Sequence, residues 1–214
     1  MNTAAAVPEG RPVLGPLVPR RGNAFSRWLA RVLLWFGGWE LVGSPPDAAQ
    51  FVVTAAPHTS NMDGWLLLLA AFATGFDQHW VVKHTAFKGP WAPILRWSGA
   101  IGVDRRAAGG MVQQVLEQFE RRPRFVLIVA PEGTRRRVEA WKSGFYRIAV
   151  RAKVPICMGF IDYGRKRAGF GPNFMPSGDY RKDLARIVEF YRLITPRHPE
   201  LFALPTNLSD EPQR

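Results

Sequence analysis

Only one cysteine, Cys157, occurs among the 214 residues, so the chain cannot form an internal disulfide. This favours a protein of a reducing compartment. Long hydrophobic runs are also missing: the longest central stretch without a charged residue or histidine, Gly64 to Phe76, has 13 residues. Because a membrane-spanning helix needs about 20 apolar residues, we expect no transmembrane helix. The first residues show no signal-peptide pattern either.

Acidic residues are scarce: the chain has 17 Asp and Glu against 29 Lys and Arg, a net charge of +12, and 23 of the basic residues are arginines. This excess predicts anionic partners, namely nucleic acid, acidic lipid headgroups or phosphate-bearing substrates. Arginine binds phosphate through paired hydrogen bonds, which lysine cannot form. Apolar residues make up 47% of the chain, and this excludes a disordered protein and indicates one domain with a sizeable core.

The two ends of the chain differ from its middle. Residues 1–22 are rich in Ala, Pro, Gly and Arg without hydrophobic periodicity, and we expect a mobile, disordered tail there. Residues 205–214 predict a second, polar tail. Between the tails we expect an N-terminal amphipathic helix within residues 23–42 and a folded domain over residues 43–204.

The N-terminal helix is predicted by seven apolar residues at helical spacing: Phe25, Trp28, Leu29, Val32, Leu33, Trp35 and Phe36. Arg27 and Arg31 fall on the opposite side, and the Gly37-Gly38 pair would end the helix. Two interpretations are open. The helix packs on the core, or it is an interfacial helix whose Trp, Phe and Arg side chains associate with membrane headgroups.

The middle of the chain alternates between short apolar runs and longer amphipathic segments. The runs predict buried strands at Phe51–Ala56, His79–Lys83, Ala100–Val103 and Phe125–Ala130. The longer segments predict helices at Gly64–Thr74, Pro90–Trp97 and Gly109–Arg121. After Pro155 we expect strands at Ile156–Tyr163 and Ala168–Phe170, then a helix beginning near Tyr180 and ended by Pro196. This alternation indicates an α/β fold with a mixed, mostly parallel sheet flanked by helices.

His58 and Asp63 stand between the first strand and the helix that follows it. Five positions apart, they meet only if the chain bends between them. Pro57 would end the strand, and Ser60 or Asn61 can cap the next helix, which puts Asp63 in its first turn. There Asp63 could hold one nitrogen of His58 and leave the other to act as a base. The alternative is a carboxylate that only stabilises the helix start.

Charged residues follow three other predicted strands. Asp104, Arg105 and Arg106 follow one, Pro131-Glu-Gly-Thr-Arg135 follows another, and Lys83-His84 follows a third. Because ligands gather at the carboxyl ends of the strands in α/β sheets, we expect these groups and His58 at one edge. Taken singly, the arginines also fit a solvated charge run, and the Pro-Glu-Gly-Thr segment also fits a tight turn. No spacing of Cys and His indicates a zinc site, and we expect no metal.

Taken together, these blocks resemble the phospholipid and glycerol acyltransferase family, of the 1-acylglycerol-3-phosphate acyltransferase type. The resemblance covers about residues 50 to 165. The four matching blocks are the His-x4-Asp motif at His58–Asp63, Gly99 to Arg105, Pro131 to Arg135, and Val154-Pro155-Ile156. The segment from Trp141 to Phe145 is also similar to the family. The resemblance implies a glycerol-3-phosphate acyltransferase-like fold and an acyltransferase domain over residues 43–204.

By this resemblance, His58 removes the proton of an acceptor hydroxyl that attacks an acyl thioester, and Asp63 orients His58. The residues implied to bind the acceptor phosphate are Arg105, Glu132, Gly133, Thr134, Arg135 and Lys83. No cofactor is implied: acyl-CoA or acyl carrier protein is a co-substrate. The implied partners are a lysophospholipid and a membrane surface, with no nucleic acid, and the implied location is the cytoplasmic face of the cell membrane, as a peripheral protein.

Two alternatives stand beside this interpretation. The acceptor could be a different lyso-lipid, of the ornithine-lipid or glycine-lipid type. The chain could also be a non-catalytic basic module that binds a membrane or nucleic acid, since charge and aromatic content alone would suit one. No nucleic-acid motif is visible, and the arginines are scattered along the sequence.

Overall fold

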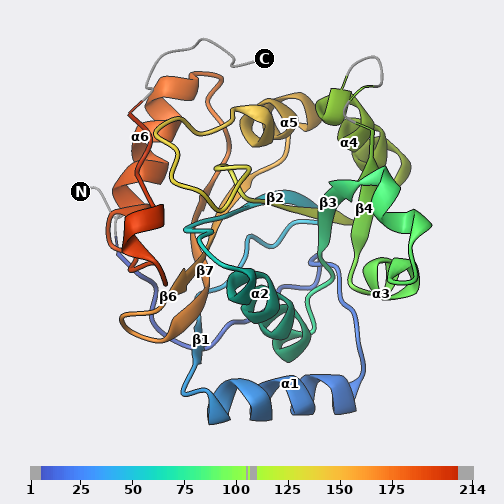
Figure 1. Cartoon of the computed structure of the whole chain (residues 1–214), viewed down its shortest axis with the longest axis vertical. Coiled ribbons are helices and arrows are strands. Elements are labelled where there is room, and N and C mark those ends of the chain that lie inside the picture. Colours follow the sequence, from blue (N-terminus) through green and yellow to red (C-terminus); the bar gives the residue numbers. More distant parts are fainter. Residues whose placement is uncertain (1–5, 105, 107–109, 207–214) are drawn as a thin grey trace.

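A seven-stranded sheet forms the centre of the computed structural model, which describes residues 6–104, 106 and 110–206 (Figure 1). Its strand order is β1-β7-β6-β2-β5-β3-β4, and every neighbouring pair is parallel except β6 and β7. The strands are β1 Glu40–Val42, β2 Gln50–Ala55, β3 His79–Lys83, β4 Ala100–Val103, β5 Phe125–Val129, β6 Ile156–Asp162 and β7 Arg167–Phe174. The predicted α/β class with a mixed, mostly parallel sheet is confirmed.

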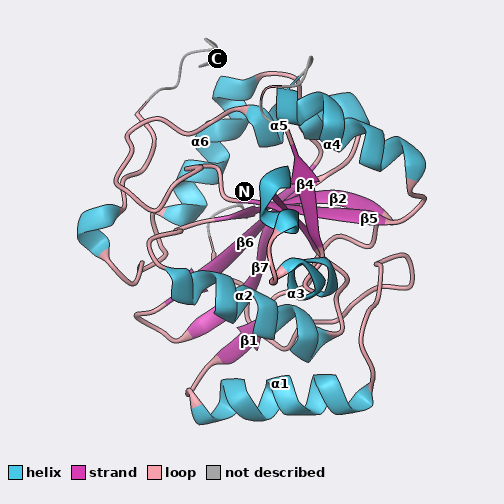
Figure 2. Ribbon diagram, turned by 45° about the vertical axis from the view of Figure 1, so that its right-hand side comes forward, coloured by secondary structure: helices cyan, strands magenta, loops and turns pink. Residues whose placement is uncertain are grey.

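Helices cover both faces of this sheet (Figure 2). The α-helices are α1 Ala24–Phe36, α2 Asn61–Thr74, α3 Ala92–Trp97, α4 Gly110–Arg121, α5 Gly144–Ala152 and α6 Tyr180–Tyr191. Two short 3-10 helices are η1 His84–Lys88 and η2 Pro199–Leu201. Figure 2 shows α4, α5 and α6 on one side of the sheet, and α2, with α1 beyond it, on the other.

The core is divided in two by the alternation of side chains along the strands. In β2, Val52 packs into the cluster beneath α4, α5 and α6, whereas Phe51 and Val53 pack into the cluster on the opposite face. All three side chains are at most 1% exposed. A strand buried on both faces needs a continuous apolar run rather than an alternating one, and this is why the run was readable in the sequence.

Helix α1 lies within the segment 23–42 where an N-terminal helix was expected, and it shows which side packs, while its association with a membrane stays a prediction. Its buried residues, Ala30 and Leu34, lie against Leu66 and Ala73 of α2. Its larger apolar side chains are exposed, among them Trp35 at 71% and Phe36 at 76%. The helix ends at Phe36, with Gly37 as its C-cap residue. None of the described helices is both long and apolar enough to cross a bilayer.

The prediction of a mobile tail over residues 1–22 is wrong for the described part of that segment. Val18 is fully buried in the cluster that contains Phe51 and Phe76, and the backbone N–H of Arg21 donates to the carbonyl oxygen of Gly75 at 2.8 Å. The segment has no periodicity because it is neither helix nor strand, yet its apolar side chains pack against β2 and α2 on one face of the sheet.

The expected C-terminal tail is described only at its beginning. Pro205 is buried, and the N–H of Thr206 donates to the carbonyl oxygen of Glu139 at 2.9 Å. The rest of the predicted tail, residues 207–214, lies outside the described residues. Strand β1 was not predicted, because three residues are too few to reveal an alternating pattern.

Candidate functional site

The site is built where β2 ends and α2 begins. The strand stops at Ala55, Ser60 is the N-cap residue of α2, and Asp63 lies in the first helical turn. The N–H of Ser60 donates to Asp63 Oδ2 at 2.8 Å, and the Ser60 hydroxyl donates to Asp63 Oδ1 at 2.9 Å. The turn returns the chain so that His58 Nδ1 lies 3.6 Å from Asp63 Oδ2. The predicted meeting of imidazole and carboxylate therefore occurs, and Asp63 stabilises the helix start as well.

Asp63 is held rigidly. Its carboxylate is 1% exposed and accepts two further hydrogen bonds, from the N–H of Thr59 at 2.7 Å and from the Tyr163 hydroxyl at 2.7 Å. An ionised carboxylate only accepts hydrogen bonds, and these donors satisfy both of its oxygens. A side chain fixed in this way can orient an imidazole without moving during the reaction.

Tyr163 had no role in the sequence analysis. It follows β6, which runs parallel to β2, so its side chain arrives at the same edge of the sheet as His58. Burial and the neighbouring Asp63 raise the pKa of the Tyr163 phenol to about 12, so it stays a donor to that carboxylate near neutral pH. The only feature of the sequence that could have pointed to Tyr163 is its position, since this hydroxyl-bearing aromatic residue comes directly after a strand that neighbours β2.

The imidazole of His58 is suited to act as a base. Burial lowers its pKa, Asp63 opposes this shift, and the positive charge of Arg135 adds to it. Because the ordinary pKa of histidine is about 6.5, a lowered value leaves the ring neutral at pH 7. The side chain is still 24% exposed, so a substrate can reach it. With Nδ1 toward Asp63, the other ring nitrogen is left to take a proton.

Glu132 supports the same loop from the neighbouring strand. It follows β5, is 5% exposed, and accepts the backbone N–H of His58 at 3.0 Å through Oε2. Burial, opposed by the His58 N–H and assisted by the charge of Asp63, raises the pKa of its carboxyl to about 7. Its predicted part in a phosphate pocket stays a prediction, and its contact with His58 was not foreseen.

Arg135 is brought to the mouth of the site. Its guanidinium donates to the side-chain oxygen of Asn61, the first residue of α2, and its charge acts on His58. The guanidinium is exposed and can still meet an anion. The expected proximity of Arg135 to the His58–Asp63 pair is therefore present.

Gly133 and Thr134 form the turn between Glu132 and Arg135. Gly133 has a φ of 66°, and a Cβ added there would lie 2.9 Å from Cε of Lys142. The aliphatic part of Lys142 thus lies across the glycine and brings a further positive charge to the loop. The Thr134 hydroxyl accepts the N–H of Arg136 at 3.3 Å.

Of the two remaining phosphate-binding candidates, Lys83 lies on β3 and Arg105 follows β4 in the sequence. Lys83 ends β3 with an exposed side chain, at the same edge of the sheet as His58. Asp104 follows β4 and is held by Gln114, whose side-chain oxygen accepts its N–H at 3.0 Å. Arg105 lies outside the described residues, so its predicted role stays a prediction. Across the described part of the chain, no group of three His, Cys, Asp or Glu side chains could hold a metal ion.

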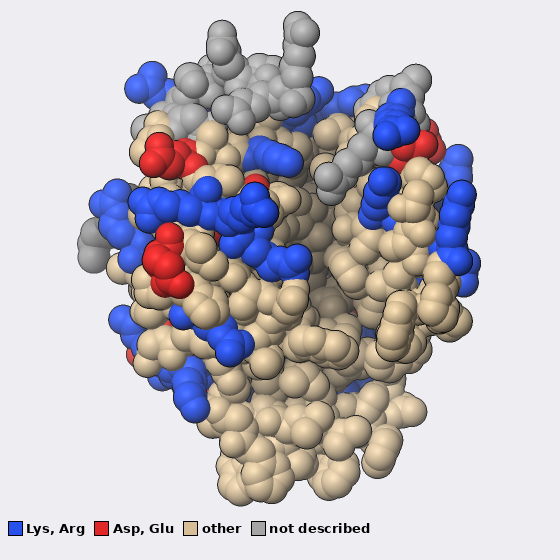
Figure 3. All heavy atoms as spheres, viewed as in Figure 1, with Lys and Arg blue, Asp and Glu red and all other residues tan. Residues whose placement is uncertain are grey.

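Figure 3 shows a hollow in the middle of one face, with Lys and Arg side chains gathered along its upper rim. The lower part of this face, over α1 and α2, is drawn almost entirely without charged side chains. Exposed apolar residues in this region include Met62 at 43% and Trp65 at 62%, which flank Asp63 in the first turns of α2.

Comparison with known proteins agrees with this geometry. The family model described as Acyltransferase matches residues 45–158, more than half of the chain. The crystal structure of the 1-acyl-sn-glycerophosphate (LPA) acyltransferase PlsC from Thermotoga maritima is similar, with a TM-score of 0.53, 21% identity, and coverage of 77% of this chain and 73% of that chain. At this identity the likeness establishes the fold. No curated protein sequence matched the chain. The matched family and the shared fold confirm the resemblance noted in the sequence, and the chain belongs to the Acyltransferase family.

Proposed function

We propose that this acyltransferase moves a fatty acyl group from acyl-CoA or acyl carrier protein to the hydroxyl of a lysophospholipid such as 1-acylglycerol-3-phosphate. The observation that carries the proposal is the pair of His58 and Asp63, 3.6 Å apart, beside the exposed guanidinium of Arg135. An acceptor hydroxyl needs a base, and its phosphate needs a cation. His58 as the base and Arg135 as the cation both lie at the mouth of one site.

His58 acts as the general base. Its neutral imidazole takes the proton of the acceptor hydroxyl while the hydroxyl oxygen attacks the thioester carbonyl. The C–S bond then breaks, and the imidazolium returns its proton to the departing thiolate. Asp63 stabilises the imidazolium that forms between these steps, and the hydrogen bonds from Thr59, Ser60 and Tyr163 keep the carboxylate in place. No covalent acyl-enzyme is required.

The acceptor phosphate is held by Arg135, with Lys142 across Gly133 as a second cation. Arg105 and Lys83 are further phosphate ligands in this proposal, since both follow strands that end at the same edge of the sheet. A guanidinium offers two parallel donors to a phosphate, which fixes the orientation of the substrate as well as its affinity. The hydroxyl is then presented to His58.

Exposed aromatic side chains support binding to a membrane surface, where lysophospholipids reside. On α1 these are Phe25, Trp28, Trp35 and Phe36; Trp97 lies on α3, and Trp91 is the N-cap residue of that helix. Trp and Phe suit the headgroup boundary, and the basic balance of the chain favours the anionic cytoplasmic leaflet. The protein is proposed to act there as a peripheral enzyme.

The test is release of CoA from acyl-CoA in the presence of lysophosphatidic acid. We expect His58→Ala to lower kcat/KM by about 10²- to 10⁴-fold, as expected when a general base is lost. The wild-type kcat/KM should also fall only below about pH 6.5, because burial lowers the pKa of His58.

The matched control is His198→Ala, which removes an exposed imidazole that pairs with Glu200 at 3.4 Å. Equal CoA release by wild type and His58→Ala would refute the base role. If wild type releases none, a lyso-ornithine or lyso-glycine lipid acceptor is the next substrate, and failure there too would favour a binding module without catalysis.

A further inference from the structure

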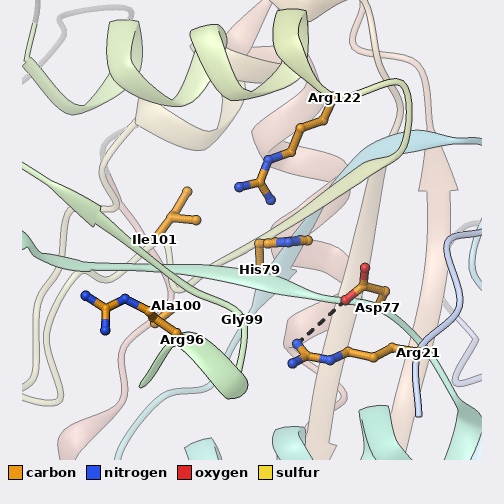
Figure 4. Close-up of a pocket in the computed structure, with 8 residues that line it drawn as sticks. All are labelled: Arg21, Asp77, His79, Arg96, Gly99, Ala100, Ile101 and Arg122. Atoms are coloured by element: carbon orange, nitrogen blue, oxygen red, sulfur yellow. Dashed lines mark ion pairs between the residues drawn. The ribbon is translucent and has the colours of Figure 1, made fainter. Parts of the chain in front are cut away.

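A second polar cavity lies at the opposite edge of the sheet from His58 (Figure 4). It has a volume of about 430 Å³. Asp77 and His79 line it from the start of β3, and Gly99 and Ala100 from the start of β4. Since β3 has five residues and a strand rises about 3.3 Å per residue, this edge is about 15 Å from the one that carries the catalytic histidine.

Three arginines line the cavity from three separate segments. Arg21 precedes α1, Arg96 belongs to α3, and Arg122 follows α4. Asp77 is the one carboxylate among the described lining residues, and its Oδ1 lies 3.8 Å from Arg21 Nη1. The lining thus contains three guanidinium groups and one carboxylate, so the cavity carries a net positive charge.

Two of the three arginines, Arg96 and Arg122, are positioned by aromatic rings rather than by carboxylates. Arg96 lies over the ring of Phe87 at 5.4 Å and Arg122 over the ring of Phe125 at 5.3 Å, contacts that orient a guanidinium but leave its charge. Figure 4 shows Arg122 and Arg21 reaching toward His79 from opposite sides, while the guanidinium of Arg96 points away from it. Two cations therefore flank the imidazole and a third lies at the rim.

His79 adds an unsatisfied polar atom to this cavity. Its Nδ1 is buried and has no hydrogen-bond partner in the described structure. Burial lowers the pKa of the ring, Asp77 opposes this, and the charges of Arg122 and Arg21 lower it further. An anion between the arginines would offset both repulsions, so binding would raise the pKa of His79.

We propose that this cavity binds a phosphate group, at a site separate from the acceptor site beside His58. Two sources share this chemistry: the headgroup of an anionic phospholipid and a soluble phosphate compound. The headgroup is consistent with the surroundings, because Arg21 is three residues before α1 and Arg96 precedes Trp97, both next to exposed apolar surface. Guanidinium groups at such a boundary suit lipid phosphates.

The first experiment titrates the full-length protein, labelled with ¹⁵N, with pyrophosphate and follows the ring signals of its histidines by NMR. We expect the His79 signals to shift and its pKa to rise. Arg122→Gln should raise the Kd at His79 by roughly tenfold, the effect of losing one charge-assisted hydrogen bond. The matched control is Arg124→Gln, which removes an exposed arginine of the same segment that does not line the cavity.

The second experiment measures sedimentation with vesicles of phosphatidylcholine with and without phosphatidic acid. If the source is a lipid headgroup, Arg122→Gln weakens binding to phosphatidic-acid vesicles relative to Arg124→Gln. If the source is soluble, the two variants bind vesicles alike and differ only with pyrophosphate. Either result supports the site. The proposal is overturned if the two variants behave alike in both experiments, or if pyrophosphate shifts only the His58 signals.

Two further measurements keep these results interpretable. Arg96→Gln repeats both experiments if Arg122→Gln lowers the melting temperature. His58→Ala separates the two proposals, since it should abolish acyl transfer and leave the His79 shifts in place. Failure of the phosphate site would therefore leave the proposed reaction untouched.

Discussion

His58 and His79 lie at opposite edges of one sheet, and burial lowers the pKa of both. The carboxylates beside the two rings differ in how firmly they are held. The carboxylate beside His58 is 1% exposed and accepts four hydrogen bonds from three residues, whereas Asp77 beside His79 is 30% exposed and faces an arginine. A fixed carboxylate can orient an imidazole and stabilise its positive charge, which a general base requires.

The arginines differ between the edges as well. Beside His58 the guanidinium of Arg135 donates to Asn61 at the mouth of the site. Around His79 three arginines line one cavity and one carboxylate opposes them. The same residue type, buried to a similar degree, thus suits proton transfer at one edge and anion binding at the other. The two sites differ because the charges next to each histidine differ in sign and in how firmly they are held.

The largest expected effect concerns the second buried carboxyl at the His58 edge. The pKa of Glu132 is raised from 4.5 to about 7, so the folded protein holds this proton more tightly than the unfolded chain. Stability should therefore fall as pH rises from about 4.5 to about 7, by about 3 kcal/mol from this group. In Glu132→Gln the amide oxygen still accepts the His58 N–H, but the amide does not titrate. The fall in stability with rising pH should therefore vanish in this variant.

Urea unfolding of both proteins across this pH range checks the prediction. His58 contributes the opposite slope in both, because its pKa is lowered on folding and its contribution to stability is lost as pH falls below about 6.5. The difference between the two proteins isolates Glu132. If the free energies of unfolding of wild type and Glu132→Gln change with pH in parallel, the pKa of the Glu132 carboxyl is not raised by burial.

A smaller effect is expected from loosening the carboxylate beside His58. Tyr163→Phe removes one donor to Asp63 and should lower kcat about tenfold with little change in KM, because it acts on the orientation of His58 and not on substrate binding. Thr59 and Ser60 still hold the carboxylate, so activity should not disappear.

Tyr146→Phe is the matched control. Tyr146 donates to the buried Asp183 at 2.9 Å, so its loss removes the same kind of hydrogen bond at a position away from the His58 site. Both variants should lose about 1–3 kcal/mol of stability, but only Tyr163→Phe should lose kcat. An equal loss of kcat in both would assign the Tyr163 effect to general destabilisation.

The smallest effect is expected at the His79 edge. Asp77→Asn removes the one described carboxylate that lines that cavity, so pyrophosphate binding should strengthen about threefold. The gain is small because Asp77 is partly exposed and water screens its charge. Titration calorimetry would measure it, with Asp179→Asn, an exposed carboxylate that caps α6, as the control. Weaker binding in Asp77→Asn would mean that the cavity does not select for negative charge.

Much of the His58 edge was predictable from the sequence because its signals are local. The apolar run of β2 and the helix cap at Ser60 act over a few neighbouring positions, and together they bring His58 to Asp63. The sheet order was not needed for that pair. By contrast, the contact of Glu132 with the backbone of His58 spans 74 positions and required β5 to lie beside β2.

The His79 cavity was invisible in the sequence for the same reason. Arg21 lies in a segment expected to be a tail, and Arg122 follows a helix on the other side of the sheet. Neither position carries a pattern that links it to His79. They converge only because the described N-terminal segment packs against the end of α2 and because β3 lies next to β5.

Residue types and local spacing were enough to establish the α/β class, the junction at His58 and the acyltransferase resemblance, since each is written in short blocks and in their order along the chain. The order of the strands settled which distant side chains would meet: Tyr163 reaches Asp63 across 100 positions, and three arginines gather around His79. Long-range packing chooses that order by burying apolar area, a quantity that depends on the whole chain rather than on any one segment.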